Sequence, residues 1–199
     1  MGETDDTYAG LAQGCGRRTV LKAALALGLG LSWVDVAAAQ ESDARKARPQ
    51  EGDQFVFAAG ERKGDVITPE DLPLGGPPAL AYPLAPGTKV VRDGSRLNQV
   101  LLIRLDPEVL AENIRRHAAA GIMAYSAICT HEGCEVTDWH EQTKALECPC
   151  HLSEFDPKDG ARVIGGPAPR RLPTLPLKIA NGILMAAGGF VGRVGFQQG

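Results

Sequence analysis

The chain has 199 residues, and its 21 basic and 24 acidic side chains give a formal net charge of −3. Without an excess of positive charge or a basic cluster, nothing indicates nucleic-acid binding, and we expect no nucleic-acid partner. Aromatic residues make up only 5% of the chain, whereas glycines number 24 and prolines 14, which favours short strands joined by many turns.

The N-terminal region has the features of an export signal. Residues 16–22 (GRRTVLK) resemble a twin-arginine motif centred on Arg17 and Arg18, and residues 23–34 form an apolar run. This run is short for a membrane span, which needs about twenty residues. Small residues ending at Ala39 offer a cleavage site. We therefore predict a signal over residues 1–39; an uncleaved anchor and an ordinary buried helix are the alternatives.

The remaining chain is long enough for one domain with its own core. Residues 40–53 are polar and charged and predict a flexible tether. Residues 54–199 predict a mainly β, antiparallel domain. Expected strands cover 54–58, 89–92, 99–105, 122–128, 135–139, 144–147, 175–179, 183–187 and 190–196.

Turns and one helix connect these strands. Asp93-Gly94 predicts a hairpin between 89–92 and 99–105, and Asn181-Gly182 predicts another. Asp106 followed by Pro107 predicts the start of a single short inserted helix over 107–119. We expect a turn over residues 154–160.

Two short boxes carry the chemistry: box 1, residues 129–134 (CTHEGC), and box 2, residues 148–153 (CPCHLS). Each offers one cysteine and one histidine at metal-ligand spacing, namely Cys129 with His131 and Cys148 with His151. Two thiolates and two imidazoles could hold one tetrahedral zinc ion in a structural module, or a two-iron cluster. Structural zinc sites usually open with two closely spaced cysteines, so the Cys-x-His opening favours the cluster.

The two boxes, about fifteen to twenty residues apart, resemble those of Rieske [2Fe–2S] proteins. This resemblance implies a Rieske-type sandwich with a small cluster-binding subdomain at about residues 125–170. It implies that the inner iron is bound by Cys129 and Cys148 and the outer iron by His131 and His151. It also implies a disulfide between Cys134 and Cys150, which requires an oxidising compartment.

The resemblance extends to residues around the cluster. Ser153 aligns with a serine whose hydroxyl donates to a bridging sulfide. Phe155 stands where the family often has a tyrosine that donates to a cysteine sulfur, so we expect a reduction potential below that of high-potential members but well above about −400 mV. The resemblance also implies a loop that covers the cluster; a plain turn is the alternative. This loop consists of Gly166, Pro167, Ala168 and Pro169.

These features predict an exported electron-transfer subunit of a larger oxidoreductase, on the periplasmic side of the inner membrane. It would be soluble if the leader is cleaved and otherwise N-terminally anchored. Residues 148–157 and the leader resemble the small subunit of arsenite oxidase, whereas residues 166–169 resemble the Rieske subunit of cytochrome bc complexes. Glu132 replaces an apolar residue common in members that meet quinol, and this argues against quinol oxidation.

The predicted partners are a catalytic or cytochrome subunit, a c-type cytochrome or similar electron acceptor, and the twin-arginine translocase. No substrate pocket or catalytic residue is predicted in this chain, so catalysis would belong to a partner. A Rieske oxygenase would need two histidines and a carboxylate for a further iron, and no remaining segment supplies them.

Overall fold

The computed structural model describes residues 33–196, and side chains from residue 39 onward. Arg17 and Arg18, the centre of the predicted export motif, lie outside the described residues. Helix α2 spans Trp33–Lys46. No helix within residues 33–196 combines the length and apolar character that crossing a membrane requires. All sheets belong to the unit formed by residues 39–199.

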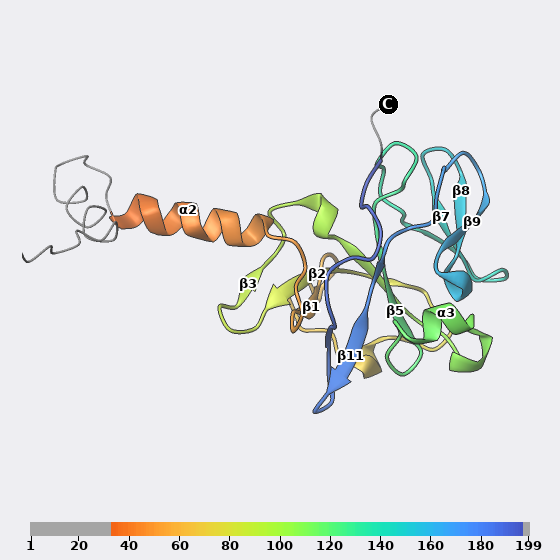
Figure 1. Ribbon diagram of the computed structural model, residues 1–199, viewed down its shortest axis with the longest axis horizontal. Helices are drawn as coiled ribbons and strands as arrows, with labels where there is room; N and C mark the ends of the chain where they lie inside the picture. The colour runs from red at the N-terminus through yellow and green to blue at the C-terminus, as the bar shows by residue number, and fades with distance from the viewer. Residues whose placement is uncertain (1–32, 197–199) are drawn as a thin grey trace, which may run out of the picture. The chain divides into compact units, whose positions relative to one another are not determined.

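A six-stranded antiparallel sheet forms the base of this unit (Figure 1). Its strands follow the order β1-β2-β4-β5-β10, and β3 pairs with β2. A separate hairpin, β11 with β12, packs beside it. The strands are β1 (Gln54–Phe57), β2 (Ala79–Ala85), β3 (Val90–Val91), β4 (Val100–Arg104), β5 (Ile122–Ser126), β10 (Thr174–Leu175), β11 (Leu177–Ala180) and β12 (Ile183–Ala186).

A second antiparallel sheet of four strands lies beyond β5, at the upper right of Figure 1. It consists of β6 (Asp138–His140), β7 (Ala145–Cys148), β8 (Ser153–Asp156) and β9 (Arg162–Gly165) in sequential order. The two antiparallel sheets with little helix confirm the predicted mainly β class.

The large sheet is buried on both faces. Side chains alternate along a strand, so Ile103 and Tyr125 enter one core while Leu102 and Ile122 enter the other. The first core continues into the small sheet and includes Phe155. Among the described residues, Cys129 and Cys148 are the cysteines that form no disulfide, and both lie in this same core, which places the two boxes against it.

Several predicted connections were wrong. The strands that flank Asp93-Gly94 do not form a hairpin, because β3 pairs with β2 while β4 pairs with β2 and β5. Strand β2 was not predicted, because its interior Pro83 argues against a strand. The expected turn at 154–160 is instead β8 followed by a 3-10 turn, Pro157–Asp159, and β9 was also missed.

The inserted helix is shorter than predicted. A 3-10 turn, Pro107–Val109, begins where Asp106 accepts a hydrogen bond from the Glu108 amide at 3.0 Å, as its capping pattern predicts. Leu110 is extended, with φ −78° and ψ 135°, so only α3 (Glu112–Arg115) follows. Within the described part of the C-terminal segment, residues 190–196 form no strand; Val191 makes a single bridge to Thr174.

Residues 44–53 are held against the domain, which differs from the predicted flexible tether. Helix α2 continues to Lys46. The buried Asp53 carboxylate accepts two hydrogen bonds from Arg92, at 2.6 and 3.0 Å. The Asn98 side chain donates to the Ala47 carbonyl at 2.9 Å. Polar residues that the sequence suggests are solvent-exposed therefore form hydrogen bonds with partners about forty to fifty positions away.

Candidate metal centre

Box 1 is the loop between β5 and β6, and box 2 is the loop between β7 and β8. Each box closes on itself through backbone hydrogen bonds. In box 1 the Cys129 amide donates to the Cys134 carbonyl at 2.8 Å, and in box 2 the Leu152 amide donates to the Cys148 carbonyl at 3.0 Å. These hydrogen bonds close each box into a tight loop, so the cysteine and the histidine of that box lie on the same short loop.

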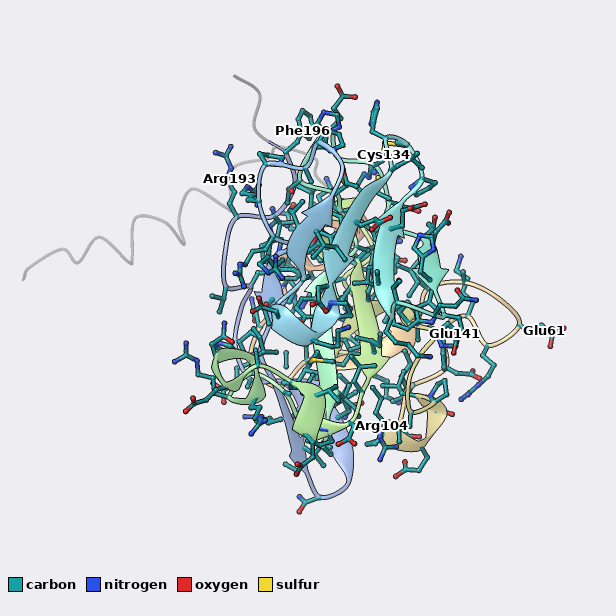
Figure 2. All side chains as sticks on the ribbon, turned by 90° about the vertical axis from the view of Figure 1, so that its right-hand side faces the viewer. Glu61, Arg104, Cys134, Glu141, Arg193 and Phe196 are labelled. Atoms are coloured by element: carbon teal, nitrogen blue, oxygen red, sulfur yellow. A yellow bond between two sulfur atoms is a disulfide. The ribbon has the colours of Figure 1, made fainter. Side chains whose placement is uncertain are left out.

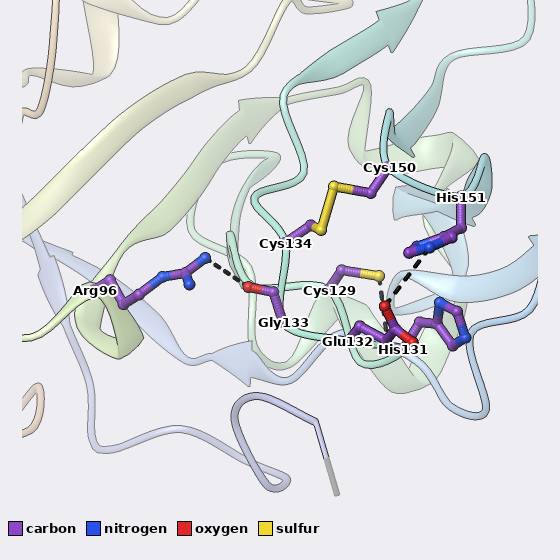
Figure 3. Close-up of a disulfide and its surroundings, with 8 residues drawn as sticks. All are labelled: Arg96, Cys129, His131, Glu132, Gly133, Cys134, Cys150 and His151. Carbon is purple, nitrogen blue, oxygen red and sulfur yellow. Dashed lines mark hydrogen bonds and ion pairs between the residues drawn. A yellow bond between two sulfur atoms is a disulfide. The ribbon is translucent and has the colours of Figure 1, made fainter. Parts of the chain in front are cut away.

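The structure joins the boxes by a disulfide between Cys134 and Cys150, whose Cα atoms are 6.5 Å apart (Figure 3). Cys129 and Cys148 are not in a disulfide and are each about 1% exposed. Of the four cysteines in the boxes, two therefore form a disulfide and two remain as buried thiols that are available as ligands.

The Cys129 thiol lies in a setting that disfavours its free thiolate. Burial raises the pKa of the Cys129 thiol, and the nearby Cys148 raises it further. The His131 amide, 3.5 Å from the Cys129 sulfur, opposes this rise. Because a metal binds the thiolate, a bound metal would supply the positive charge that keeps the buried sulfur deprotonated.

The two imidazoles lie together on the outer side of the boxes. The ring centroids of His131 and His151 are 4.6 Å apart and the rings are perpendicular. Nδ1 of His131 is buried and has no hydrogen-bond partner among the described residues. An unsatisfied buried nitrogen is costly, so this atom fits the position of a metal ligand. Nε2 of His151 lies 3.6 Å from a carboxylate oxygen of Glu132 (Figure 3).

The donor geometry distinguishes between the two metal alternatives. A single tetrahedral zinc ion would bring all four ligand atoms within about 4 Å of one another. Among the described residues, however, no group of three ligand atoms within 4.8 Å combines a thiol with an imidazole. The separation of buried thiols from outer imidazoles fits a two-iron cluster, with sulfur ligands on one iron and nitrogen ligands on the other.

Ser153, the last residue of box 2, and Phe155 lie on β8, and both are fully buried. The Ser153 hydroxyl lies near the Cys129 thiol and lowers the pKa of that thiol, against the rise that burial causes. Its oxygen also accepts a hydrogen bond from the Ala168 amide at 3.1 Å. Phe155 packs in the same core as both thiols and offers no donor.

The proline loop, residues 166–169, packs directly on box 2. Gly166 has a φ of +75°, and a Cβ there would lie 2.5 Å from the Ser153 Cα. Thr130 in box 1 donates to the carbonyl of Arg170, which follows the loop, at 2.6 Å. The structure therefore brings the loop and both boxes together.

Sequence reasoning missed three residues that support box 1. Arg96 donates to the Gly133 carbonyl at 2.5 Å (Figure 3). Arg170 donates to the carbonyls of Arg193 and Gly195, and this holds the Phe196 ring against Gly133. No local pattern marks these contacts, because each joins segments that are more than twenty residues apart.

Comparisons with known proteins agree with this geometry. A family model for the Rieske [2Fe–2S] domain matches residues 98–176. The cytochrome bc1 complex Rieske iron-sulfur subunit of Streptomyces lividans is 44% identical over 136 residues, which cover 65% of this chain and 78% of that protein. The chain belongs to the Rieske [2Fe–2S] family. A Rieske domain binds a [2Fe–2S] cluster, so the predicted cofactor is confirmed.

Other Rieske relatives differ in length. A protein of Haloferax mediterranei, named as the Rieske subunit of a respiratory nitrate reductase, is 42% identical over 106 residues, covering 52% of this chain and 47% of that protein. The chain therefore spans about half the length of that relative. Among solved structures, a hyperthermophilic respiratory Complex III chain matches with 22% identity and a TM-score of 0.42, covering 84% of this chain and 90% of that chain.

Proposed function

We propose that this protein is an exported carrier of single electrons, one subunit of a respiratory oxidoreductase. The observation that carries the proposal is the separation of two buried thiols from two outer imidazoles. The bound [2Fe–2S] cluster supplies one-electron redox chemistry. The chain's own part is to hold that group rigidly, exclude water from its inner side and present its outer side to a partner.

Each ligand has a distinct role in this proposal. Cys129 and Cys148 bind the inner iron from within the core, where burial keeps solvent away. His131 and His151 bind the outer iron, and the 42% exposed side chain of His151 lies nearest the partner. Ser153 stabilises the reduced, more negative form by donating toward sulfur.

Export is supported by the disulfide between Cys134 and Cys150, since such bonds persist in oxidising compartments. We infer that the domain acts on the periplasmic side of the inner membrane. The twin-arginine translocase, which carries folded proteins, would move it across with its cluster in place. Cleavage near Ala39 would release the domain, and an intact leader would anchor it.

Within this function, we favour a relay in a periplasmic oxidase, like the small subunit of arsenite oxidase. A catalytic subunit would reduce the carrier, and a c-type cytochrome or similar acceptor would oxidise it. The exposed Glu132 carboxylate beside His151 supports this choice, because an ionised group disfavours an apolar quinone pocket.

The second candidate is the Rieske subunit of a quinol–cytochrome c reductase. It is supported by the similarity to the Streptomyces lividans protein, which is named as a subunit of a cytochrome bc1 complex and of which this chain covers 78%. The two candidates share the cofactor and differ in the electron donor.

The test is to purify the protein from its own host by a C-terminal tag and identify its partners in membrane and periplasmic fractions. A molybdenum-containing subunit in the soluble fraction supports the periplasmic relay. Cytochrome b and c subunits from the membrane support the reductase. A colourless, redox-silent product that contains zinc contradicts both.

A further inference from the structure

The outward face of the small sheet carries a row of acidic side chains. Strand pairing places Asp138 on β6 opposite Glu147 on β7, and Glu147 opposite Glu154 on β8. Their neighbours Leu146 and Phe155 enter the core, and alternation along a strand turns the acidic side chains to the other face. Like charges directly opposite each other destabilise a sheet. This row therefore calls for a positive charge close by.

His140 on β6 lies against this row. Its Nε2 atom is 2.9 Å from a carboxylate oxygen of Glu147. One nitrogen or oxygen atom from each of His140, Glu147 and Glu154 lies within 4.8 Å of the other two. The Glu147 side chain is only 13% exposed, and Glu154 is half-buried. We call His140, Glu147 and Glu154 the sheet triad.

Glu154 is the member of the sheet triad without a counterion. In the part of the chain whose side chains are described, no hydrogen bond or ion pair reaches its carboxylate. The basic side chain nearest to it in the sequence, Lys158, pairs with Asp156 at 3.7 Å. Arg162 on the adjoining β9 pairs with Asp159 at 2.8 Å. A carboxylate that is partly removed from water without a partner costs free energy.

The sheet triad offers the ligand atoms of a divalent metal site. A protonated His140 would balance one of the two glutamates, whereas a divalent cation beside a neutral imidazole balances both. Calcium and magnesium prefer oxygen ligands alone, so the imidazole favours zinc. Four-coordinate zinc holds its ligand atoms within about 4 Å of one another, so a small rotation of the glutamates closes the present 4.8 Å around an ion.

The sheet triad adjoins box 2 in the chain. Glu147 directly precedes Cys148, and Glu154 directly follows Ser153. Because side chains alternate, the triad lies on the opposite face of these strands from the buried thiol and hydroxyl. An ion that joins the two glutamates would fix the two strands from which box 2 extends. Its positive charge would also favour the reduced, more negative form of the cluster.

We propose that the sheet triad is a second metal site, which binds a zinc-class divalent ion independently of the iron–sulfur cluster. His140 supplies a neutral imidazole nitrogen, and Glu147 and Glu154 each supply a carboxylate oxygen. The bound ion connects β6, β7 and β8 next to box 2 and raises the reduction potential of the cluster. Zinc has no redox chemistry of its own, so it stays divalent while the cluster exchanges its electron. The inference depends on the cofactor and not on the proposed electron partners.

The experiment titrates zinc chloride into the cluster-loaded full chain by isothermal titration calorimetry, while the visible absorbance of the cluster is recorded. We expect one zinc ion per chain and an unchanged cluster spectrum. His140→Ala and Glu154→Gln should each weaken zinc binding at least about tenfold, because a lost ligand costs no less than a lost partner behind a ligand. Anomalous diffraction at the zinc edge should place the ion about 2.1 Å from Nε2 of His140.

His117→Ala and Glu141→Gln are the matched controls, because neither residue belongs to a group of metal-ligand side chains within the described residues. Glu141→Gln removes one negative charge, as Glu154→Gln does, so it separates ligation from net charge. Figure 2 views the small sheet with Cys134 near its upper end and Glu141 near its lower end. Both controls should bind zinc as tightly as the wild type. Similar melting temperatures in the absence of zinc verify that the variants are folded.

A redox titration with and without zinc measures the effect on the cluster. Zinc should raise the potential of the wild type and of both controls and leave that of His140→Ala unchanged. Absence of zinc binding, equal affinity in the triad variants and the controls, or zinc that displaces iron would overturn the metal site. Zinc bound at the triad without a change in potential would overturn its effect on the cluster.

Discussion

The hydroxyl oxygen of Ser153 accepts a hydrogen bond from the Ala168 amide at 3.1 Å. This contact fixes the hydroxyl against the proline loop, near the Cys129 thiol whose pKa it lowers. The Ser153 oxygen acts as the acceptor in this bond, so the hydroxyl proton is still free to be donated toward a cysteine or sulfide sulfur. One side chain thus links the position of the covering loop to the stability of the reduced centre.

Ser153→Ala should lower the reduction potential. A hydrogen bond to a charged group contributes about 1.5 kcal/mol, equivalent to about 60 mV for one electron. The measurement is a spectroscopic redox titration of wild type and variant. Ser153→Thr, which keeps the hydroxyl, is the matched control, and its reduction potential should lie close to that of the wild type. An unchanged potential in Ser153→Ala would show that the hydroxyl does not stabilise the reduced form.

Phe155→Tyr should raise the potential by tens of millivolts, because it adds a hydroxyl donor within the core that holds both thiols. Phe155 is fully buried, so the new group must find its acceptor inside the protein. Phe155→Leu serves as the control for altered packing, since it adds no donor. A redox titration in which the tyrosine variant shows no rise counts against this account of Phe155.

Gly166→Ala should displace the proline loop, because its Cβ would lie 2.5 Å from the Ser153 Cα. Gly182→Ala is a close control: Gly182 has a φ of +76°, against +75° for Gly166, but nothing lies within 4 Å of its Cβ position. Both variants strain the left-handed backbone, but only in Gly166→Ala would the added Cβ collide with Ser153. We expect faster loss of visible absorbance to an iron chelator in Gly166→Ala, and equal rates in the two variants would exclude a covering role.

Loss of the disulfide should destabilise the site. Cys134 and Cys150 are 16 positions apart, and closing a loop of about that length contributes about 3 kcal/mol. Cys134→Ser with Cys150→Ser is expected to lower the free energy of unfolding by up to about that amount, measured by denaturant titration. Iron release should accelerate as well. An unchanged free energy of unfolding together with an unchanged rate of iron release would mean that the ligands alone hold the two boxes together.

Arg92→Leu should be among the most damaging changes far from the boxes. It leaves the buried Asp53 carboxylate without its bidentate partner, which costs about 3–5 kcal/mol when a buried pair is broken. Asp53→Asn with Arg92→Leu removes both charges and should recover part of the loss. Trypsin cleavage after Arg45 or Lys46 reports release of the 44–53 segment. Resistance equal to that of the wild type would contradict the role of this ion pair in holding the segment.

The sequence predicted the site more completely than the fold around it. Box 1 and box 2 are local patterns, so spacing alone marked Cys129, His131, Cys148 and His151 as candidate ligands. Strand pairing is not local: β3 and β4 flank a strong turn signal, yet both pair with β2. The hydrogen bonds between Arg92 and Asp53 could not be predicted from the sequence either, because a charged side chain in a polar segment gives no sign of a distant buried partner.

The most direct test of the central claim is metal and sulfide analysis of the purified chain together with electron paramagnetic resonance of its reduced form. We expect two irons and two acid-labile sulfides per chain, with nitrogen couplings from two imidazoles that are lost when His131 and His151 are both replaced. One zinc ion without sulfide, or a paramagnetic centre without nitrogen ligands, would contradict it.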